Sequence, residues 1–268
     1  MSDVTDLPAP QGDPTEGPAI AVRGLGKRFG DLIAVKGIDL DVPRGSFFGL
    51  VGPNGAGKTT TLSMVTGLLR PDAGQAFVLG RDVWADPVAT KRLLGVLPDG
   101  LKVFDRLTGL QLITYAGLLR GMSRELATER AAELVAALGL TEAQGKLVVD
   151  YSAGMTKKVT LASALVHGPR VLVLDEPFEA VDPISAATIR RILSGFVESG
   201  GTVVLSSHVM DLVERICTHV AVISDGLVLA AGRLEDVRGD RSLEERFVDL
   251  VGGSTEVVGL SWLRTSSG

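Results

Sequence analysis

Short hydrophobic runs recur along the first third of the chain and are interrupted by glycines and charged residues. Residues 38–42 alternate between apolar and polar side chains, which is the pattern of a half-exposed strand. Two shorter apolar segments, 20–22 and 32–35, precede it. We therefore expect an antiparallel sheet near the N-terminus, followed by a turn at Pro43-Arg44-Gly45.

A second kind of run is apolar throughout, which is typical of strands buried on both faces of a parallel sheet. The clearest cases are residues 47–51 and 171–174, and residues 202–207, whose centre Val203-Val204-Leu205 is apolar, predict a buried strand of the same kind. Shorter apolar runs predict further strands at 75–80 and 93–97. Residues 220–230 carry a central Asp-Gly pair and predict a hairpin.

Helical spacing replaces these runs in the middle of the chain. Apolar residues recur at helical intervals over 110–119 and 125–138, and each stretch is followed by a glycine. A third helical pattern covers 156–166, and a last amphipathic one covers 243–251. We expect a helical subdomain, about residues 100–165, inserted into an α/β core.

Composition limits what the chain can do. The 268 residues are 45% hydrophobic, which is ample for a core, and the formal net charge is −5. The acidic balance leaves no basic stripe for DNA or RNA, so we expect no nucleic-acid partner. No apolar run approaches the ~20 residues that span a bilayer.

The two ends and the single cysteine have little predicted role. Residues 1–19 are rich in proline and acids, which predicts a disordered arm, and 253–268 is expected to be a loosely attached tail. Residues 20–252 remain as the folded domain. Cys217 excludes an internal disulfide, fits a reducing compartment and is expected to lie in the core.

One stretch carries a specific chemical pattern: a glycine, four residues, then Gly-Lys-Thr, between a predicted strand and a predicted helix. Such a loop points backbone N–H groups at phosphates, its lysine reaches the outer phosphates, and its hydroxyl ligates Mg²⁺. Its residues are Gly52, Pro53, Asn54, Gly55, Ala56, Gly57, Lys58, Thr59 and Thr60. This P-loop predicts nucleotide binding, and the flanking strand and helix argue against a chance glycine-rich turn.

Polar residues at the ends of two other buried strands extend this site. Asp175 and Glu176 follow the run 171–174, and His208 follows 202–207. Placing two acids at the end of a buried strand costs free energy unless they contact a cation or a reacting water. Beside a P-loop, Asp175 is expected to hold Mg²⁺ mainly through water, Glu176 to polarise the attacking water, and His208 to contact the γ-phosphate.

Three further residues have two interpretations each. Phe29, in a predicted glycine-flanked loop, is either a ring that stacks on the nucleotide base or an ordinary half-buried aromatic. Asp99 follows a predicted strand and is either a ligand-binding group or a turn-forming residue. Ser152 lies before a predicted helix and is either part of an anion site or a plain N-cap.

In this order, the motifs resemble the nucleotide-binding subunit of ATP-binding-cassette (ABC) transporters over roughly residues 20–251. The resemblance implies a P-loop NTPase core with a mostly parallel sheet, an N-terminal antiparallel β subdomain and an inserted helical subdomain. It implies an ATPase with ATP and Mg²⁺ as cofactors. In this family two subunits pair head to tail, with ATP between the P-loop of one and the signature loop of the other.

The resemblance also assigns roles to single residues. Phe29 fits the aromatic that stacks on adenine, and Asp182 fits the acid of the D-loop. Asp175 and Glu176 correspond to the Walker B acid and the catalytic base, and His208 corresponds to the switch histidine. Ser152 and Gly154 correspond to signature residues that face the γ-phosphate of the partner's ATP.

Two positions depart from the family pattern. The signature usually reads Leu-Ser-Gly-Gly-Gln, whereas here residues 151–155 are Tyr-Ser-Ala-Gly-Met. Asp99 replaces the Q-loop glutamine. Aspartate can still reach Mg²⁺ through water, although its shorter side chain changes the reach.

The amino-acid sequences of residues 95–99, 107–109 and 207–215 are similar to those of the type-2 exporter branch. This implies a separate membrane-spanning permease subunit, a second ABC subunit as homodimer or heterodimer, and a cytoplasmic position on the inner face of the cell membrane. The helical subdomain and residues 99–108 would receive a cytoplasmic coupling helix of the permease.

A non-transport role is the alternative. A DNA-repair or chromosome-maintenance ATPase would need heptads or a basic patch between the P-loop and the signature, and 61–150 has neither. A translation-factor cassette would carry two P-loops in one chain. A regulatory ABC ATPase that acts on a partner protein stays open at this stage.

Overall fold

Two β-sheets and a layer of helices make up the part of the chain that the computed structural model describes, residues 17–100 and 104–252. The predicted tail 253–268 and most of the predicted arm lie outside these residues. Ala19, just before the first strand, is already packed into the fold: it is buried, and its N–H donates to the Val42 carbonyl at 2.8 Å.

The N-terminal sheet is antiparallel, as expected, and has the order β2-β1-β4-β5. Its strands are β1 (Ile20–Phe29), β2 (Leu32–Val42), β4 (Ala73–Val78) and β5 (Arg81–Asp82). The short predicted segments merge into two long strands because bulges absorb the glycines within them, as at the register shift between Val22 and Leu25. Phe29 is therefore the last residue of β1, paired with Leu32, and its prediction in a loop was wrong.

The second sheet has the order β10-β9-β3-β8-β7-β6, with all neighbouring pairs parallel except β10 with β9. The strands are β3 (Phe47–Val51), β6 (Leu94–Leu97), β7 (Val171–Leu174), β8 (Thr202–Ser207), β9 (His219–Ser224) and β10 (Leu227–Arg233). The β9–β10 turn has positive φ at Asp225 and Gly226, as a type I′ hairpin requires. The α/β fold class with a mostly parallel sheet is confirmed.

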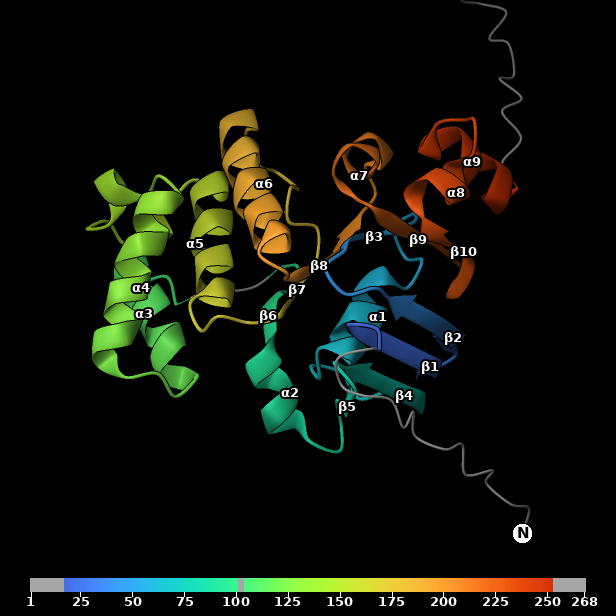
Figure 1. The fold of residues 1–268 in the computed structure, drawn as a ribbon, viewed down its shortest axis with the longest axis horizontal. Coiled ribbons are helices and arrows are strands. Elements are labelled where there is room, and N and C mark those ends of the chain that lie inside the picture. The colour runs from blue at the N-terminus through green and yellow to red at the C-terminus, as the bar shows by residue number, and fades with distance from the viewer. Residues whose placement is uncertain (1–16, 101–103, 253–268) are drawn as a thin grey trace, which may run out of the picture.

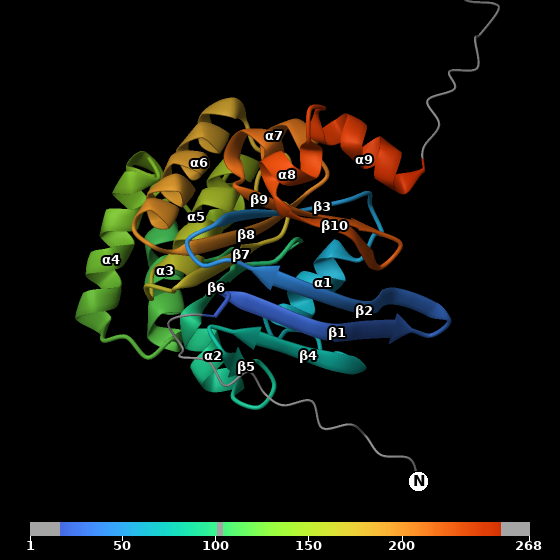
Figure 2. The same ribbon diagram turned by 45° about the vertical axis from the view of Figure 1, so that its right-hand side comes forward.

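Helices cover the parallel sheet, and three of them form a separate layer at one end of the molecule (Figures 1 and 2). That layer contains α3 (Gly109–Leu119), α4 (Arg124–Ala137) and α5 (Ala153–Leu165), together with two 3₁₀ turns, Thr141–Ala143 and Val148–Asp150. The other helices are α1 (Lys58–Val65), α2 (Pro87–Leu93), α6 (Pro183–Glu198), α7 (Met210–Ile216), α8 (Leu234–Arg238) and α9 (Leu243–Val251). Within residues 17–100 and 104–252, no helix combines the length and apolar character that bilayer crossing requires.

The core positions the strand ends for function. Strands β3, β7 and β8 are buried along their whole length, so their register is strongly fixed. Since they run parallel, the P-loop, the residues after β7 and the residues after β8 leave the sheet at one edge. Cys217 is buried against this core, as expected, and burial raises the pKa of its thiol.

Candidate active site

A cleft of about 450 Å³ lies at the carboxyl edge of the parallel sheet. It is bounded on one side by the β1–β2 hairpin and on the other by residues that follow β6, β7 and β8. Its lining residues are Phe29, Leu32, Ala34, Asn54, Gly55, Ala56, Gly57, Lys58, Thr59, Thr60, Asp99, Glu176, Glu179 and His208.

The P-loop requires glycine at two positions for steric reasons. A Cβ on Gly52 would lie 2.1 Å from the Ile223 carbonyl oxygen. Gly57 has a φ of +100°, and a Cβ there would lie 2.5 Å from the Ala34 carbonyl oxygen. The loop is thus wedged between β9 and the β1–β2 hairpin, and only glycine permits this approach.

Lys58 is buried at the start of α1, and its ammonium group faces the loop. Nζ donates to the carbonyls of Gly52 at 2.8 Å and Pro53 at 3.1 Å and lies 4.0 Å from Glu176 Oε1. Burial lowers the pKa of Lys58, and the carboxylates of Glu176 and Asp175 oppose this shift. The lysine is therefore poised inside the loop that is expected to hold phosphates.

Ser206 connects the two acids at the end of β7. Asp175 is 3% exposed, and its carboxylate accepts a short hydrogen bond from Ser206 Oγ. The same Oγ accepts the N–H of Glu176 at 2.9 Å. Sequence reasoning missed Ser206, although two serines at the end of an otherwise apolar strand were a visible sign of a polar role.

His208 completes this group from the end of β8. Its Nδ1 lies 3.1 Å from Glu176 Oε1, and its side chain is 43% exposed on the cleft. The structure therefore brings together Lys58, Glu176 and His208, which lie far apart in the sequence.

Phe29 and Asp99 both line this cleft. Phe29 is 47% exposed, and Lys27 Nζ lies 5.6 Å from the centroid of its ring. Asp99 is exposed just after β6. Leu32 and Ala34 extend the wall formed by Phe29; sequence analysis missed them because the contact depends on how the hairpin packs over the P-loop.

Ser152, Gly154 and Asp182 form a separate group and do not line this cleft. Ser152 caps α5 by accepting the Met155 N–H at 3.3 Å. Asp182 caps α6 and accepts from Ile184 and Ser185; hydrogen bonds from the Ser185 amide and hydroxyl lower the pKa of Asp182. A Cβ on Gly154 would lie 2.6 Å from Asp182 Oδ2, so the signature loop and the D-loop segment are in contact.

The donors in and beside the cleft are suited to Mg²⁺. Thr59, Asp99 and Asp175 offer hydroxyl and carboxylate oxygens, which this ion prefers. No cluster of three or more His, Cys, Asp or Glu side chains in the described part of the chain could hold a metal by itself. Mg²⁺ commonly takes one or two protein ligands and completes its shell with phosphate oxygens and water, so this sparse set fits.

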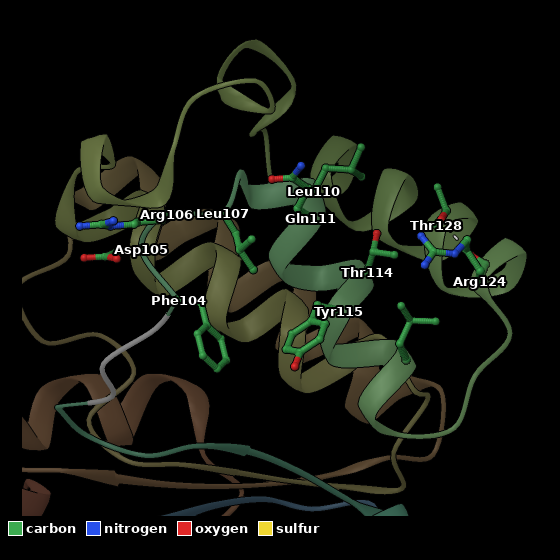
Figure 3. Close-up of a pocket in the computed structure, with 11 residues that line it drawn as sticks. Phe104, Asp105, Arg106, Leu107, Leu110, Gln111, Thr114, Tyr115, Arg124 and Thr128 are labelled. Atoms are coloured by element: carbon green, nitrogen blue, oxygen red, sulfur yellow. Dashed lines mark hydrogen bonds between the residues drawn. The ribbon is translucent and has the colours of Figure 1, made fainter.

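A larger hollow of about 740 Å³ lies on the helical layer, away from the cleft. Figure 3 shows the rings of Phe104 and Tyr115 side by side along α3; they meet edge to face, with centroids 5.7 Å apart. Arg106 and Arg124 lie toward opposite ends of this hollow (Figure 3). We call it the helical-layer groove; it is lined by Phe104, Asp105, Arg106, Leu107, Leu110, Gln111, Thr114, Tyr115, Leu118, Arg124 and Thr128.

The P-loop, the strand-end acids and the histidine define a P-loop ATPase. Residues 35–179 match the family described as ABC transporter, and the chain belongs to this family as its ATP-binding, ATP-hydrolysing subunit. Subunits of this family dimerise and work with membrane permease subunits.

Characterised relatives and a solved structure agree with this assignment. The chain is 39% identical over 220 residues to the daunorubicin/doxorubicin resistance ATP-binding protein DrrA of Streptomyces peucetius, covering 82% of this chain and 67% of that protein. It is 34% identical over 218 residues to the linearmycin resistance ATP-binding protein LnrL of Bacillus subtilis, covering 81% and 70%. A solved ATP binding subunit of an ABC transporter superposes with a TM-score of 0.81 at 26% identity, covering 87% of this chain and 99% of that one.

Proposed function

We propose that this chain hydrolyses ATP in a head-to-tail pair of subunits and drives export through a separate membrane permease. The convergence of Lys58, Glu176 and His208 on one cleft carries the hydrolytic part of this proposal. The relatives named for resistance to daunorubicin, doxorubicin and linearmycin support export as the direction of transport.

Within the cleft, each residue has a distinct role. The amides of residues 52–60 and the ammonium group of Lys58 hold the phosphates, and the ring of Phe29 stacks on adenine. Thr59, Asp175 and Asp99 would hold Mg²⁺ through their hydroxyl and carboxylate oxygens. Mg²⁺ supplies charge neutralisation at the phosphates when bound.

Glu176 polarises the attacking water, and His208 contacts the γ-phosphate. The 3.1 Å contact between His208 Nδ1 and Glu176 Oε1 supports this division, because it orients both groups toward the same region of the cleft. Ser206 holds Asp175 and Glu176 in a fixed relation, so the metal-binding acid and the base keep a defined separation.

The second subunit supplies the signature side of the site. Gly154 lies beside Asp182, and neither Ser152 nor Gly154 lines the P-loop cleft of its own chain, which is the arrangement expected if they act on the partner's ATP. On the helical layer, the helical-layer groove receives a cytoplasmic helix of the permease and so places the chain on the inner face of the membrane.

Hydrolysis measured against protein concentration tests this proposal. Turnover is expected to rise with concentration for the purified chain and to change when membrane proteins are co-purified from its own cells. ATP binding without turnover, even with such a membrane partner present, contradicts the proposal.

The substitution Glu176→Gln tests the role of the proposed base. ATP affinity should remain, because the P-loop is untouched, while hydrolysis should fall by at least about 100-fold as the water loses its polarising carboxylate. Equilibrium nucleotide binding and single-turnover hydrolysis measure the two effects. A variant that hydrolyses ATP at the parental rate removes Glu176 from this role.

A further inference from the structure

Glu176 has an unusual backbone conformation for a residue that carries a side chain. Its φ is +45°, in the left-handed region that is sterically costly for residues other than glycine. Such a conformation persists only where surrounding contacts hold it, and it occurs preferentially at functional sites. The contacts of this peptide unit therefore decide where the carboxylate points.

Two side chains from different elements hold the Glu176 backbone. Ser206 Oγ, from β8, accepts the Glu176 N–H at 2.9 Å, and Lys157 Nζ, from α5, donates to the Glu176 carbonyl at 2.8 Å. The Glu179 N–H also donates to this carbonyl, at 3.3 Å. We call Lys157 and Ser206 the Glu176 clamp, since together they fix both polar groups of its backbone.

The two halves of the clamp belong to different parts of the fold. Ser206 lies on β8, the strand hydrogen-bonded to β7, so it is fixed relative to Glu176 by the sheet itself. Lys157 lies on α5, the helix that Ser152 caps, in the helical layer. A shift of α5 against the sheet would therefore change the bond to the Glu176 carbonyl and leave the bond to its N–H intact.

Lys157 also lies beside the nucleotide cleft without lining it. It borders an adjacent hollow of about 370 Å³ whose lining includes Asp99 and Glu179, and these two residues also line the cleft. Its hydrogen bond to the carbonyl is charge-assisted and so stronger than one between neutral groups. Within the described residues, the ammonium group therefore reaches the site through the Glu176 carbonyl.

We propose that Lys157 is a positioning residue for hydrolysis, which holds the Glu176 carbonyl from the signature helix and thereby aims the Glu176 carboxylate. The inference rests on the proposed role of Glu176 in polarising the attacking water. It makes the geometry of the base depend on where the signature helix sits relative to the sheet.

The substitution Lys157→Met tests this inference in the full-length chain, because it keeps most of the side-chain length and removes the donor. We expect single-turnover hydrolysis to fall roughly tenfold through misplacement of the base, with ATP affinity and the midpoint of unfolding nearly unchanged. Lys157→Arg should restore most of the rate. Lys146→Met is the matched control: Lys146 is exposed on the same layer, has no side-chain hydrogen bond within the described residues, and should behave like the parent.

Glu176→Gln and the double variant Lys157→Met/Glu176→Gln complete the experiment. If Lys157 acts through Glu176, the double variant should be no slower than Glu176→Gln alone. Parental hydrolysis by Glu176→Gln overturns the proposed function itself. If Glu176→Gln is slow, the proposed function stands and the Lys157 variants decide the inference alone. The inference is overturned if Lys157→Met hydrolyses ATP at the parental rate, or if its ATP affinity falls as much as its rate. It is also overturned if Lys157→Arg does not restore the rate, or if the double variant is slower than Glu176→Gln by the full loss seen in Lys157→Met.

Discussion

Lys58, which is buried, and His167, which is half-buried, are basic side chains with opposite hydrogen-bonding environments. The ammonium group of Lys58 donates to two carbonyls, and two nearby carboxylates oppose the lowering of its pKa by burial. His167 has a different environment: its Nε2 lies 3.0 Å from the Leu94 carbonyl, and its buried Nδ1 has no hydrogen-bond partner in the described part of the chain. A proton on that nitrogen would be both desolvated and unpaired.

His167 should therefore make stability depend on pH. Burial, assisted by the nearby charge of Arg120, lowers the pKa of His167 from 6.5 to about 4. Between these values the unfolded chain binds a proton that the folded chain does not. The contribution of His167 to the free energy of unfolding is thus fully present above pH 6.5 and is lost as the pH falls toward about 4. We expect urea unfolding to show a lower stability at about pH 5 than at about pH 7.5.

His167→Gln isolates this contribution. Glutamine can still donate to the Leu94 carbonyl but does not titrate, so the stability difference between the two pH values should shrink in the variant. Other titrating groups contribute equally to the pH dependence of stability in both proteins, so their contributions cancel in the comparison. An unchanged difference would show that His167 titrates normally in the folded chain.

At the scale of single elements, the signature loop is tied to α3 by one close contact. Tyr151 Oη donates to the Ala143 carbonyl at 3.0 Å. A Cβ on Gly109, the first residue of α3, would lie 2.4 Å from the same Tyr151 Oη. The tyrosine that replaces the family's usual leucine thus occupies space that only glycine at position 109 leaves open.

Gly109→Ala should destabilise the chain by about 1–3 kcal/mol, because the new methyl group displaces the Tyr151 ring. Tyr151→Phe alone should cost about 1 kcal/mol through its lost hydrogen bond. The double variant Gly109→Ala/Tyr151→Phe should lose less stability than the sum of the two single losses, since removing the hydroxyl relieves the closest clash. Gly145→Ala, at a site with no atom within 4 Å of the added Cβ and no positive φ, is the neutral control. Additive losses, measured by chemical unfolding, would contradict this account.

The elements that the sequence predicted best are those whose hydrophobic pattern is unambiguous. Strands β7 and β8 match the predicted residues 171–174 and 202–207, because each has an apolar stretch that is followed by polar residues and is buried on both faces. The first two strands did not match, since bulges carry them through glycines that locally resemble turns. Bulges depend on pairing with a distant strand and leave little local trace.

The candidate site divides in the same way. The P-loop, Asp175, Glu176 and His208 were predictable because each follows a buried strand, and parallel strands place their carboxyl ends together. The walls formed by Leu32 and Ala34, and the clamp formed by Lys157 and Ser206, depend on tertiary packing between elements far apart in sequence. The spacing of residues along the chain does not predict those contacts.

At the scale of the whole molecule, the helical-layer groove and the signature loop are physically connected. The Val148 N–H donates to the Leu107 carbonyl at 2.9 Å, and the Val149 N–H donates to the Asp105 carbonyl at 3.0 Å. Leu107 and Asp105 line the groove, while the segment that contains Val148 and Val149 leads directly into Tyr151 and Ser152. A helix seated in the groove therefore has a short backbone route to the loop proposed to act on the partner's ATP.

Tyr115→Glu tests the groove as the permease contact. Tyr115 is 42% exposed, so the fold and the basal ATP hydrolysis of the isolated chain should be preserved. A carboxylate in the apolar part of the groove would be desolvated by a docked helix, and the change in turnover caused by the co-purified membrane subunit should drop about tenfold or more. Val251→Glu, an equally drastic change at a 41% exposed residue at the end of α9, which lies across the molecule from α3 (Figure 1), should leave that response intact. If Tyr115→Glu responds to the membrane subunit as the parent does, the permease docks elsewhere, and the backbone route from the groove to the signature has no part in coupling.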